Sequence, residues 1–334
     1  MISIYYGTRP EYIKVYPLYV QIKEMGLSVE LVKVIQHTDL ISTFHCDRSV
    51  KLFNTEGCSN RLNSVISSIL SDDSIDVATK LVVVQGDTAT AFAVSLNAFN
   101  RKIPIAHIEA GLRTYDVENP FPEEAYRRFI SVMASYHFCV SDSGFKNLER
   151  EKIEGKKYVV GNTVLDSLLK YRDEITYGNK VLVTLHRREN KQQMREWFEL
   201  IEQIAQERKH LEFVLPLHPS TDTEVYKSLF SAVKVVDPLP HNLMIRLLKE
   251  CRFVITDSGG IQEESSFFKK KSIVCRKKTE REDGLGVFSV LCSNPQQLKE
   301  MVFRLENDPI TNAECPYGDG RSSERIALIL KGLV

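Results

Sequence analysis

The feature that most limits what this chain can fold into is a repeated alternation of short apolar runs with longer amphipathic segments. The runs are rich in β-branched residues and contain few polar positions, as expected of strands that are buried on both faces of a parallel sheet. A first series of runs covers residues 2–6, 29–35, 80–86, 103–108, 137–141 and 158–161. The amphipathic segments between them complete a βαβ pattern, which predicts a doubly wound domain.

The alternation then restarts. A second series of runs covers residues 180–186, 211–218, 233–239, 252–257, 272–277 and 288–292. Single cores rarely grow beyond about 250 to 300 residues, so a chain of 334 residues is expected to form two domains. The predicted fold class is α/β, with two Rossmann-like domains on parallel sheets and an active site in the cleft between them.

The linker between the domains is expected near residues 170–180. The last helical stretch, residues 322–334, could complete the second domain or pack on the first, and periodicity leaves both arrangements open.

Composition excludes several classes of function. Acidic and basic residues number 44 each, so nothing favours nucleic acid or an anionic membrane as a partner. The seven cysteines form no CxxC pair and no histidine-spaced cluster, so no zinc site, disulfide scaffold or metal cofactor is expected. The start MISIYYGTRPE lacks a basic leader, and no segment approaches 18 consecutive apolar residues. We therefore expect a cytoplasmic protein.

Polar residues gather after the apolar runs, and open α/β sheets bind ligands at the carboxyl ends of their strands. Ser258, Gly259 and Gly260 form a turn between a predicted strand and a helix, where free backbone N–H groups suit a phosphate. Glu264, one turn later, is placed to accept hydrogen bonds from a ribose. The alternative is that Asp257 and Ser258 only cap the helix.

Two cations follow the first predicted strand. Arg9 and Lys14 lie five positions apart across the start of a helix, which suits fixed charges on a diphosphate. The alternative is a solvated helix end. The loop has no GxGxxG, which argues against a nicotinamide or flavin cofactor.

Four titratable groups also lie near strand ends: Asp87, Glu109 and Glu123 in the first domain and His186 in the second. Clustered carboxylates shift one another's pKa values apart, which is what general acid and base catalysis needs. Taken singly, Asp87 could be a helix cap, Glu123 part of a first helical turn, and His186 a structural imidazole. Their shared position favours proton transfer. Gln36, Arg113 and His218 are predicted to line the binding site.

Ten ordered motifs resemble those of the non-hydrolysing UDP-N-acetylglucosamine 2-epimerases. They are GTRPEYIK, QGDTATAFA, HIEAGLRT, PFPEEAYRR, GNTVLDSL, VTLHRREN, LHP, TDSGGIQEE, KTERE and PYGDGRSSERI. The motifs run from residue 7 to the last helix, so the resemblance covers nearly the whole chain.

The resemblance implies a fold like that of GT-B glycosyltransferases and a homodimer. It implies an N-terminal domain over 1–168 with the catalytic carboxylates, a UDP-binding domain over 169–316, and a helix over 317–334 that returns to the first domain. The implied reaction interconverts UDP-GlcNAc and UDP-ManNAc, for bacterial surface polysaccharide synthesis. UDP is eliminated to give 2-acetamidoglucal and is then added back, without a cofactor.

Carried over motif by motif, the resemblance also implies roles for single residues. It implies catalytic roles for Asp87, Glu109, Glu123 and His186. It implies contacts with UDP for Arg9, Lys14, Ser258, Gly259, Gly260, Glu264 and Arg281. Which acid removes the C2 proton stays open.

Departures from the family pattern leave other activities open. TERED replaces the usual TERPE, and Asp39 in QHTDL stands where an amide or glutamate is more usual. The segment between QHTDL and RLNSVISSIL is short. The alternatives are a hydrolysing epimerase that releases ManNAc and UDP, an epimerase of a modified UDP-HexNAc, a GT-B glycosyltransferase, and a protein that only binds a nucleotide sugar.

Overall fold

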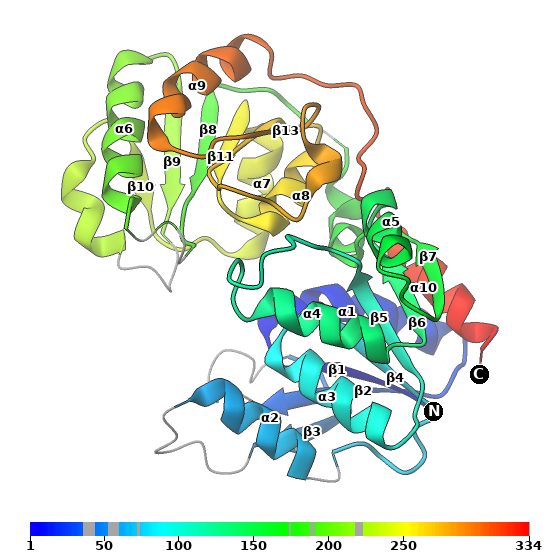
Figure 1. Cartoon of the computed structure of the whole chain (residues 1–334). Helices are drawn as coiled ribbons and strands as arrows, with labels where there is room; N and C mark the ends of the chain where they lie inside the picture. The colour runs from blue at the N-terminus through cyan, green and yellow to red at the C-terminus, as the bar shows by residue number, and fades with distance from the viewer. Residues whose placement is uncertain are drawn as a thin grey trace. The chain divides into compact units, whose positions relative to one another are not determined.

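The computed structural model describes residues 1–35, 44–52, 60–71, 74–173, 175–187, 190, 192–217 and 223–333. It divides into two compact units (Figure 1). The first unit comprises Met1–Ser167 and Gly318–Val334, and the second comprises Leu168–Tyr317.

The first unit is built on a parallel sheet with the order β3-β2-β1-β4-β5-β6-β7. Its strands are β1 (Ile2–Tyr6), β2 (Val29–Ile35), β3 (Arg48–Lys51), β4 (Leu81–Gln85), β5 (Ile105–Ala110), β6 (Tyr136–Cys139) and β7 (Lys156–Val159). The strand order reverses between β1 and β4, and a crevice for ligands opens at such a reversal in doubly wound sheets.

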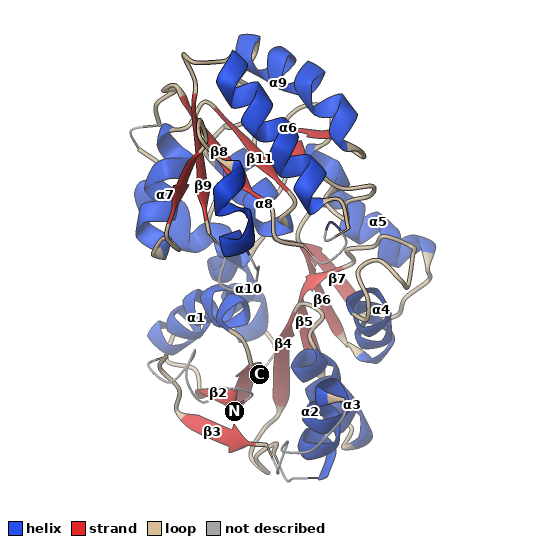
Figure 2. Ribbon diagram, turned by 90° about the vertical axis from the view of Figure 1, so that its left-hand side faces the viewer, coloured by secondary structure: helices blue, strands red, loops and turns tan. Residues whose placement is uncertain are grey.

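Helices cover both faces of this sheet. They are α1 (Arg9–Glu24), α2 (Arg61–Ser71), α3 (Ala89–Asn100), α4 (Glu123–Met133), α5 (Asp142–Arg150) and α10 (Ser322–Lys331). Figure 2 shows α1 and α10 on one side of the sheet and α2, α3 and α4 on the other. Alternate side chains of β1 fill the two cores: Ile4 and Tyr6 pack with α1 and α10, and Tyr5 packs with α2 and α3.

The C-terminal segment is fixed to the first unit by its helix start as well as by packing. The Asp166 carboxylate accepts hydrogen bonds from the backbone N–H groups of Ser322 at 2.9 Å and Ser323 at 2.5 Å. These N–H groups begin α10, so a carboxylate there satisfies unpaired donors and the helix dipole.

The second unit repeats the same topology, with the parallel order β10-β9-β8-β11-β12-β13. Its strands are β8 (Lys180–Thr184), β9 (Glu212–Pro216), β10 (Lys234–Val236), β11 (Phe253–Thr256), β12 (Ser272–Val274) and β13 (Ser289–Leu291). Its α-helices are α6 (Met194–Glu207), α7 (His241–Glu250), α8 (Gly259–Phe267) and α9 (Leu298–Asn307), with 3-10 turns at η1 (Thr163–Tyr171, which begins in the first unit), η3 (Thr223–Leu229), η4 (Glu282–Gly284) and η5 (Pro295–Gln297). The order reverses between β8 and β11.

The predicted fold class is therefore confirmed: both units are Rossmann-like α/β domains on parallel sheets. No described helix is both long and apolar enough to cross a membrane.

Candidate functional site

The predicted site residues of the first unit lie around the point where its strand order reverses. Arg9 begins α1 directly after β1, Asp87 follows β4, and Glu109 lies in β5, which neighbours β4. Parallel strands end at the same edge of a sheet, so these residues share that edge.

Glu109 has an unusual backbone conformation. Its φ is +65°, and the pairing of β5 with β6 shifts register between Ile108 and Ala110. A left-handed conformation costs a non-glycine residue ~1 kcal/mol or more. The Glu109 side chain is nonetheless fixed: Lys14 Nζ lies 2.5 Å from its Oε2, and Gln85 Nε2 donates to the same oxygen. Bulges of this kind re-aim a side chain at functional sites.

Asp87 is held by an arginine from α4. Arg127 Nε donates to Asp87 Oδ2 at 2.9 Å, and a second guanidinium nitrogen donates to the same oxygen. Arg127 also donates to Glu124 Oε2 at 3.3 Å, and Glu124 accepts the backbone N–H of Thr114 at 3.0 Å. Arg127 was not among the predicted site residues, although two acids precede it by one helical turn.

A buried glutamate joins the loops after β1 and β4. Glu11 Oε2 accepts from Gly7 N at 3.0 Å and Thr8 Oγ1 at 2.8 Å, and its Oε1 accepts from Thr88 Oγ1 at 2.6 Å. Thr8 and Thr88 are the N-caps of α1 and α3, so Glu11 completes a capping box and ties two helix starts together. Burial raises the pKa of Glu11, while the hydrogen bonds from Thr88 and Thr8 oppose that rise.

Arg113 does not lie where its predicted role requires. Its side chain is fully buried and forms a two-pronged ion pair with Glu151, at 2.9 and 2.8 Å. The guanidinium also donates to Ser131 Oγ at 3.0 Å and to its neighbour's carbonyl. These contacts hold the Arg113 guanidinium inside the first unit. Arg9, by contrast, is exposed.

Glu123 is the first residue of α4 and is partly buried. Burial raises the pKa of Tyr126, and the nearby charge of Glu123 adds to that rise. Glu123 and Tyr126 are three residues apart in α4, so they are neighbours on the surface of that helix.

In the second unit, His186 lies in the loop after β8 and faces Asp257, the residue that follows the adjacent strand β11. His186 Nδ1 is 3.6 Å from Asp257 Oδ1, and Asp257 accepts the backbone N–H of His186 at 3.0 Å and of Arg187 at 2.8 Å. Asn190 also donates to Asp257 at 3.0 Å. Burial lowers the pKa of His186, Asp257 opposes the shift, and Arg187 adds to it. Asp257 is thus the group that holds the histidine loop.

The turn after Asp257 starts α8 as predicted. Ser258 is the N-cap and accepts from Ile261 N at 3.5 Å. A Cβ on Gly259 would lie 2.5 Å from an Arg281 nitrogen, so the guanidinium lies directly against the start of the helix. A Cβ on Gly260 would meet nothing closer than Ser258 Oγ at 4.0 Å. Glu264 lies in the same helix and is 9% exposed.

Arg281 belongs to a buried network of charges. Its Nε donates to Glu263 Oε1 at 3.1 Å and another of its nitrogens donates to Glu280. Arg276 donates to Glu280 at 2.9 Å, and Arg187 approaches the same carboxylate at 3.9 Å. Three guanidinium groups thus approach two carboxylates, and the Arg281 guanidinium lies against the helix start that suits an anion.

Some predictions fall outside the described residues. Gln36 and His218, predicted to bind substrate, lie there, as do His37 and Asp39. Among the residues that the structure does describe, no cluster of three or more histidine, cysteine or carboxylate side chains is arranged to hold a metal ion.

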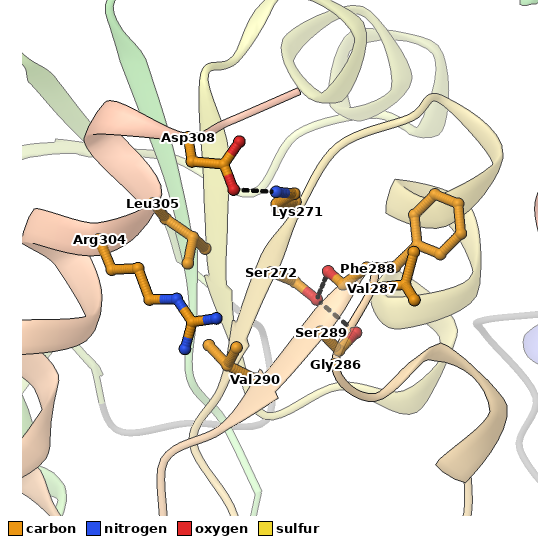
Figure 3. Close-up of a pocket in the computed structure, with 10 residues that line it drawn as sticks. All are labelled: Lys271, Ser272, Gly286, Val287, Phe288, Ser289, Val290, Arg304, Leu305 and Asp308. Carbon is orange, nitrogen blue, oxygen red and sulfur yellow. Dashed lines mark hydrogen bonds and ion pairs between the residues drawn. The ribbon is translucent and has the colours of Figure 1, made fainter. Parts of the chain in front are cut away.

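A recess of about 60 Å³ in the second unit is not part of this site. Figure 3 shows it between the first residues of β12 and β13 and the end of α9, with the Lys271–Asp308 ion pair of 2.7 Å at one side. It therefore opens at the amino ends of the strands, whereas the predicted residues lie at the carboxyl ends.

Comparison with known proteins gives a consistent result. The sequence profile described as UDP-N-acetylglucosamine 2-epimerase matches residues 28–331. The UDP-N-acetylglucosamine 2-epimerase of Escherichia coli K12 is 32% identical over 373 residues, which cover 98% of this chain and 97% of the relative.

Solved structures agree with the sequence comparison. The crystal structure of UDP-GlcNAc 2-epimerase from Neisseria meningitidis bound to UDP-GlcNAc superposes with a TM-score of 0.86 at 30% identity, and the comparison covers 99% of both chains. The crystal structure of the glycotransferase of kitacinnamycin matches with a TM-score of 0.66 at 13% identity, which shows a shared fold alone.

Proposed function

We propose, from the premise that this chain belongs to the UDP-N-acetylglucosamine 2-epimerase family, that it interconverts UDP-GlcNAc and UDP-ManNAc. UDP is eliminated across C1 and C2 to give 2-acetamidoglucal and is then added back after C2 receives a proton on its other face. The N. meningitidis relative that binds UDP-GlcNAc supports this choice of substrate.

One observation carries the proposal. Asp87 and Glu109 lie at the carboxyl ends of adjacent strands, and each carboxylate is already joined to a cation from a helix. Inversion at C2 needs a group that removes a proton from one face and a group that supplies one on the other. Carboxylates fixed by ion pairs meet the requirement that a base be held near a weakly acidic carbon.

In the first unit the proposed roles follow from these contacts. Asp87, Glu109 and Glu123 handle the C2 proton, and its electron pair forms the C1–C2 double bond as the bond from C1 to the UDP oxygen breaks. Lys14 and Gln85 hold Glu109, and Arg127 holds Asp87.

In the second unit the proposed role is to bind UDP and to stabilise the charge that it gains on leaving. The start of α8 at Ser258 to Gly260 supplies backbone donors, Arg281 supplies positive charge, and Glu264 accepts from the ribose. Burial lowers the pKa of His186, which favours the neutral imidazole, and its N–H group is the proposed donor to the leaving oxygen. Arg9, exposed in the first unit, is a further cation for the diphosphate.

The test is hydrogen exchange at C2. Purified protein is incubated with UDP-GlcNAc in deuterium oxide and followed by proton NMR. We expect the C2 proton signal to disappear and UDP-ManNAc with deuterium at C2 to accumulate. Glu109→Gln should show neither the exchange nor this product. Release of free ManNAc and UDP would instead indicate a hydrolysing epimerase. A lack of exchange with every UDP-HexNAc would remove the proposal, and transfer to an acceptor without exchange would support a glycosyltransferase.

We also propose that the protein forms a homodimer through α3 and α4. Phe99, Phe129 and Val132 are 53%, 55% and 71% exposed on these helices, beside the stacked rings of Phe92 and Tyr126. A shared apolar patch of this kind suits an isologous dimer contact. Sedimentation should give a dimer for the native chain and a monomer for Val132→Asp. A monomeric native chain would contradict it.

The proposed setting is the cytoplasm, where the product would supply surface polysaccharide synthesis. Six described cysteines are free, at positions 46, 139, 251, 275, 292 and 315, which suits a reducing compartment.

A further inference from the structure

His107 is a buried histidine that the proposed chemistry does not use. It lies in β5, two residues before Glu109, and it is fully buried. His107 Nε2 lies 2.8 Å from the carbonyl oxygen of Gly86, the residue before Asp87. A carbonyl only accepts hydrogen bonds, so Nε2 carries the hydrogen and the ring bonds as a neutral donor. Burial lowers the pKa of His107 to about 3, so the ring stays neutral at working pH.

Strand β5, which carries His107, also binds the backbone N–H of Gly86. Gly86 N donates to the carbonyl of Ile108 at 3.0 Å. Both backbone groups of Gly86 are therefore bonded to β5, and its φ of +72° is a conformation that glycine adopts without strain. The next two residues are also fixed, since Arg127 holds Asp87 and Glu11 holds Thr88.

We propose that His107 is a positioning residue that sets the place of Asp87 relative to Glu109. The inference rests on the proposed function, in which both carboxylates handle the C2 proton. Through His107 and Ile108, one strand fixes the backbone before Asp87 and also carries Glu109. Without the imidazole, the Gly86 carbonyl would lose its buried donor, and the loop would shift to regain one.

The chain offers a matched control in the adjacent strand. His137 in β6 is the register partner of His107, is equally buried, and bonds through Nε2 to the carbonyl of Glu154 at 2.9 Å. Glu154 precedes the amino end of β7, at the edge of the sheet away from the candidate site. The two histidines thus share burial, partner type and strand pairing, but only His107 holds a loop that carries a proposed catalytic group.

The experiment compares leucine and glutamine at both positions, with steady-state kinetics, UDP affinity and urea unfolding. We expect His107→Leu to lower kcat about 100-fold, the loss typical of a displacement of ~1 Å, with KM changed less than about 3-fold. His107→Gln, whose amide nitrogen can reach the Gly86 carbonyl, should recover at least about 10-fold of that loss. His137→Leu should destabilise the protein to a similar degree and leave kcat within about 2-fold.

Equal kcat losses for the two leucine variants, or a kcat for His107→Leu within about 3-fold of the native value, would overturn the inference. If His107→Leu fails to fold, His107→Asn replaces it, because the shorter amide falls short of Gly86. Asparagine should then be about 10-fold slower than glutamine, and equal rates would overturn the inference. A native protein without C2 exchange would overturn the proposed function as well, whereas an active native protein with an unaffected His107→Leu overturns this inference alone.

Discussion

Lys14 Nζ lies 2.5 Å from Glu109 Oε2 and so joins the first helix of the chain to the end of β5. The sequence suggested Lys14 as a cation for a diphosphate, but its contact in the structure is with a carboxylate. We therefore expect Lys14→Met to lower kcat about 100-fold, as the loss of a charge-assisted partner would, while UDP affinity changes less than about 2-fold.

The matched control is Arg9→Met, because Arg9 is exposed at the start of the same helix. This variant should lower UDP affinity about 10-fold, as expected for the loss of a charge-assisted bond to a phosphate. Calorimetric titration with UDP measures both. If Lys14→Met loses as much UDP affinity as Arg9→Met, Lys14 binds the diphosphate, as the sequence suggested.

Arg127 is predicted to matter for both activity and stability. Its guanidinium bonds Asp87 and Glu124, and its side chain is 5% exposed. Arg127→Leu leaves two carboxylates without their cation, which we expect to cost about 3 kcal/mol of unfolding free energy and at least about 100-fold in kcat. Arg127→Lys should recover part of the stability but less of the activity, since an ammonium cannot bond in the same fork. Urea unfolding measures the stability of each variant, and turnover at pH 7 measures kcat. A native kcat in Arg127→Leu would contradict the role of Arg127 in activity.

The strands could be predicted from sequence wherever they are buried on both faces. The runs at 2–6, 29–35 and 252–257 appear in the structure as β1, β2 and β11, with β11 shorter than its run by one residue at each end. The sequence did not predict β3, Arg48–Lys51. This strand lies at the edge of its sheet and has one buried residue, Val50. An edge strand with polar side chains lacks the apolar run that marked the others.

For the candidate site, the sequence predicted which residues lie at the ends of strands, but not which side chains they contact. The sequence placed Asp87 and Glu109 at strand ends, because ligands bind there in every sheet of this class. The sequence did not predict the contact between Arg127 and Asp87. That contact forms because β4 and β5 are neighbours and α4 packs beside them. Strand order and helix packing are tertiary properties, and periodicity does not report them.

Arg113 shows the converse case, a residue that the sequence suggested for the site but whose contacts are with other parts of the first unit. It follows Glu109 by four residues, so proximity in sequence suggested a shared site. Between them Gly111 has a φ of +84°, and a Cβ there would lie 2.1 Å from the carbonyl oxygen of Gly144. The chain therefore turns against α5, and Arg113 pairs with Glu151 instead.

The two glycines that begin α8 should respond differently to alanine. Gly259→Ala places a Cβ 2.5 Å from Arg281, so the guanidinium must move. We expect a loss of about 1 to 3 kcal/mol in stability and at least about 10-fold in UDP affinity.

Gly260→Ala has room for its Cβ, with the nearest atom at 4.0 Å. It should raise stability by up to about 1 kcal/mol, because alanine favours a helix over glycine. It should still weaken UDP binding, since a methyl group would cover the backbone donors. Urea unfolding and UDP titration separate the two effects. Native UDP affinity in Gly260→Ala would show that the diphosphate binds elsewhere.

The pH dependence of kcat/KM should report His186. Burial lowers its pKa below the ordinary value of 6.5, and Arg187 lowers it further. If the neutral ring is the active form, kcat/KM falls as the pH drops through that lowered pKa. Arg187→Met removes one cause of the shift and should move this acid limb to higher pH. Arg195→Met, which removes a cation 72% exposed on α6, should leave it in place. If the acid limb of kcat/KM stays at the same pH in Arg187→Met, a group other than His186 causes that limb.

Acid should destabilise the first unit through its buried histidines. Burial lowers the pKa of His107 to about 3 and of His137 to about 4. The unfolded chain takes up protons near 6.5, so it binds more protons than the folded state as the pH falls below that value. Stability is therefore lost on acidification. From pH 7 to pH 5 each histidine should account for about 2 kcal/mol of the loss.

His137→Gln should make that loss about 2 kcal/mol smaller, because it removes one of the two groups. Far-UV circular dichroism in urea follows the unfolding of the whole chain. The single tryptophan, Trp197, is buried in the second unit, so its fluorescence gives an internal control that the substitution should leave unchanged. An equal loss of stability in the native chain and in His137→Gln would mean that the folded protein accepts the proton on His137. The backbone bond to Glu154 would then not require a neutral ring.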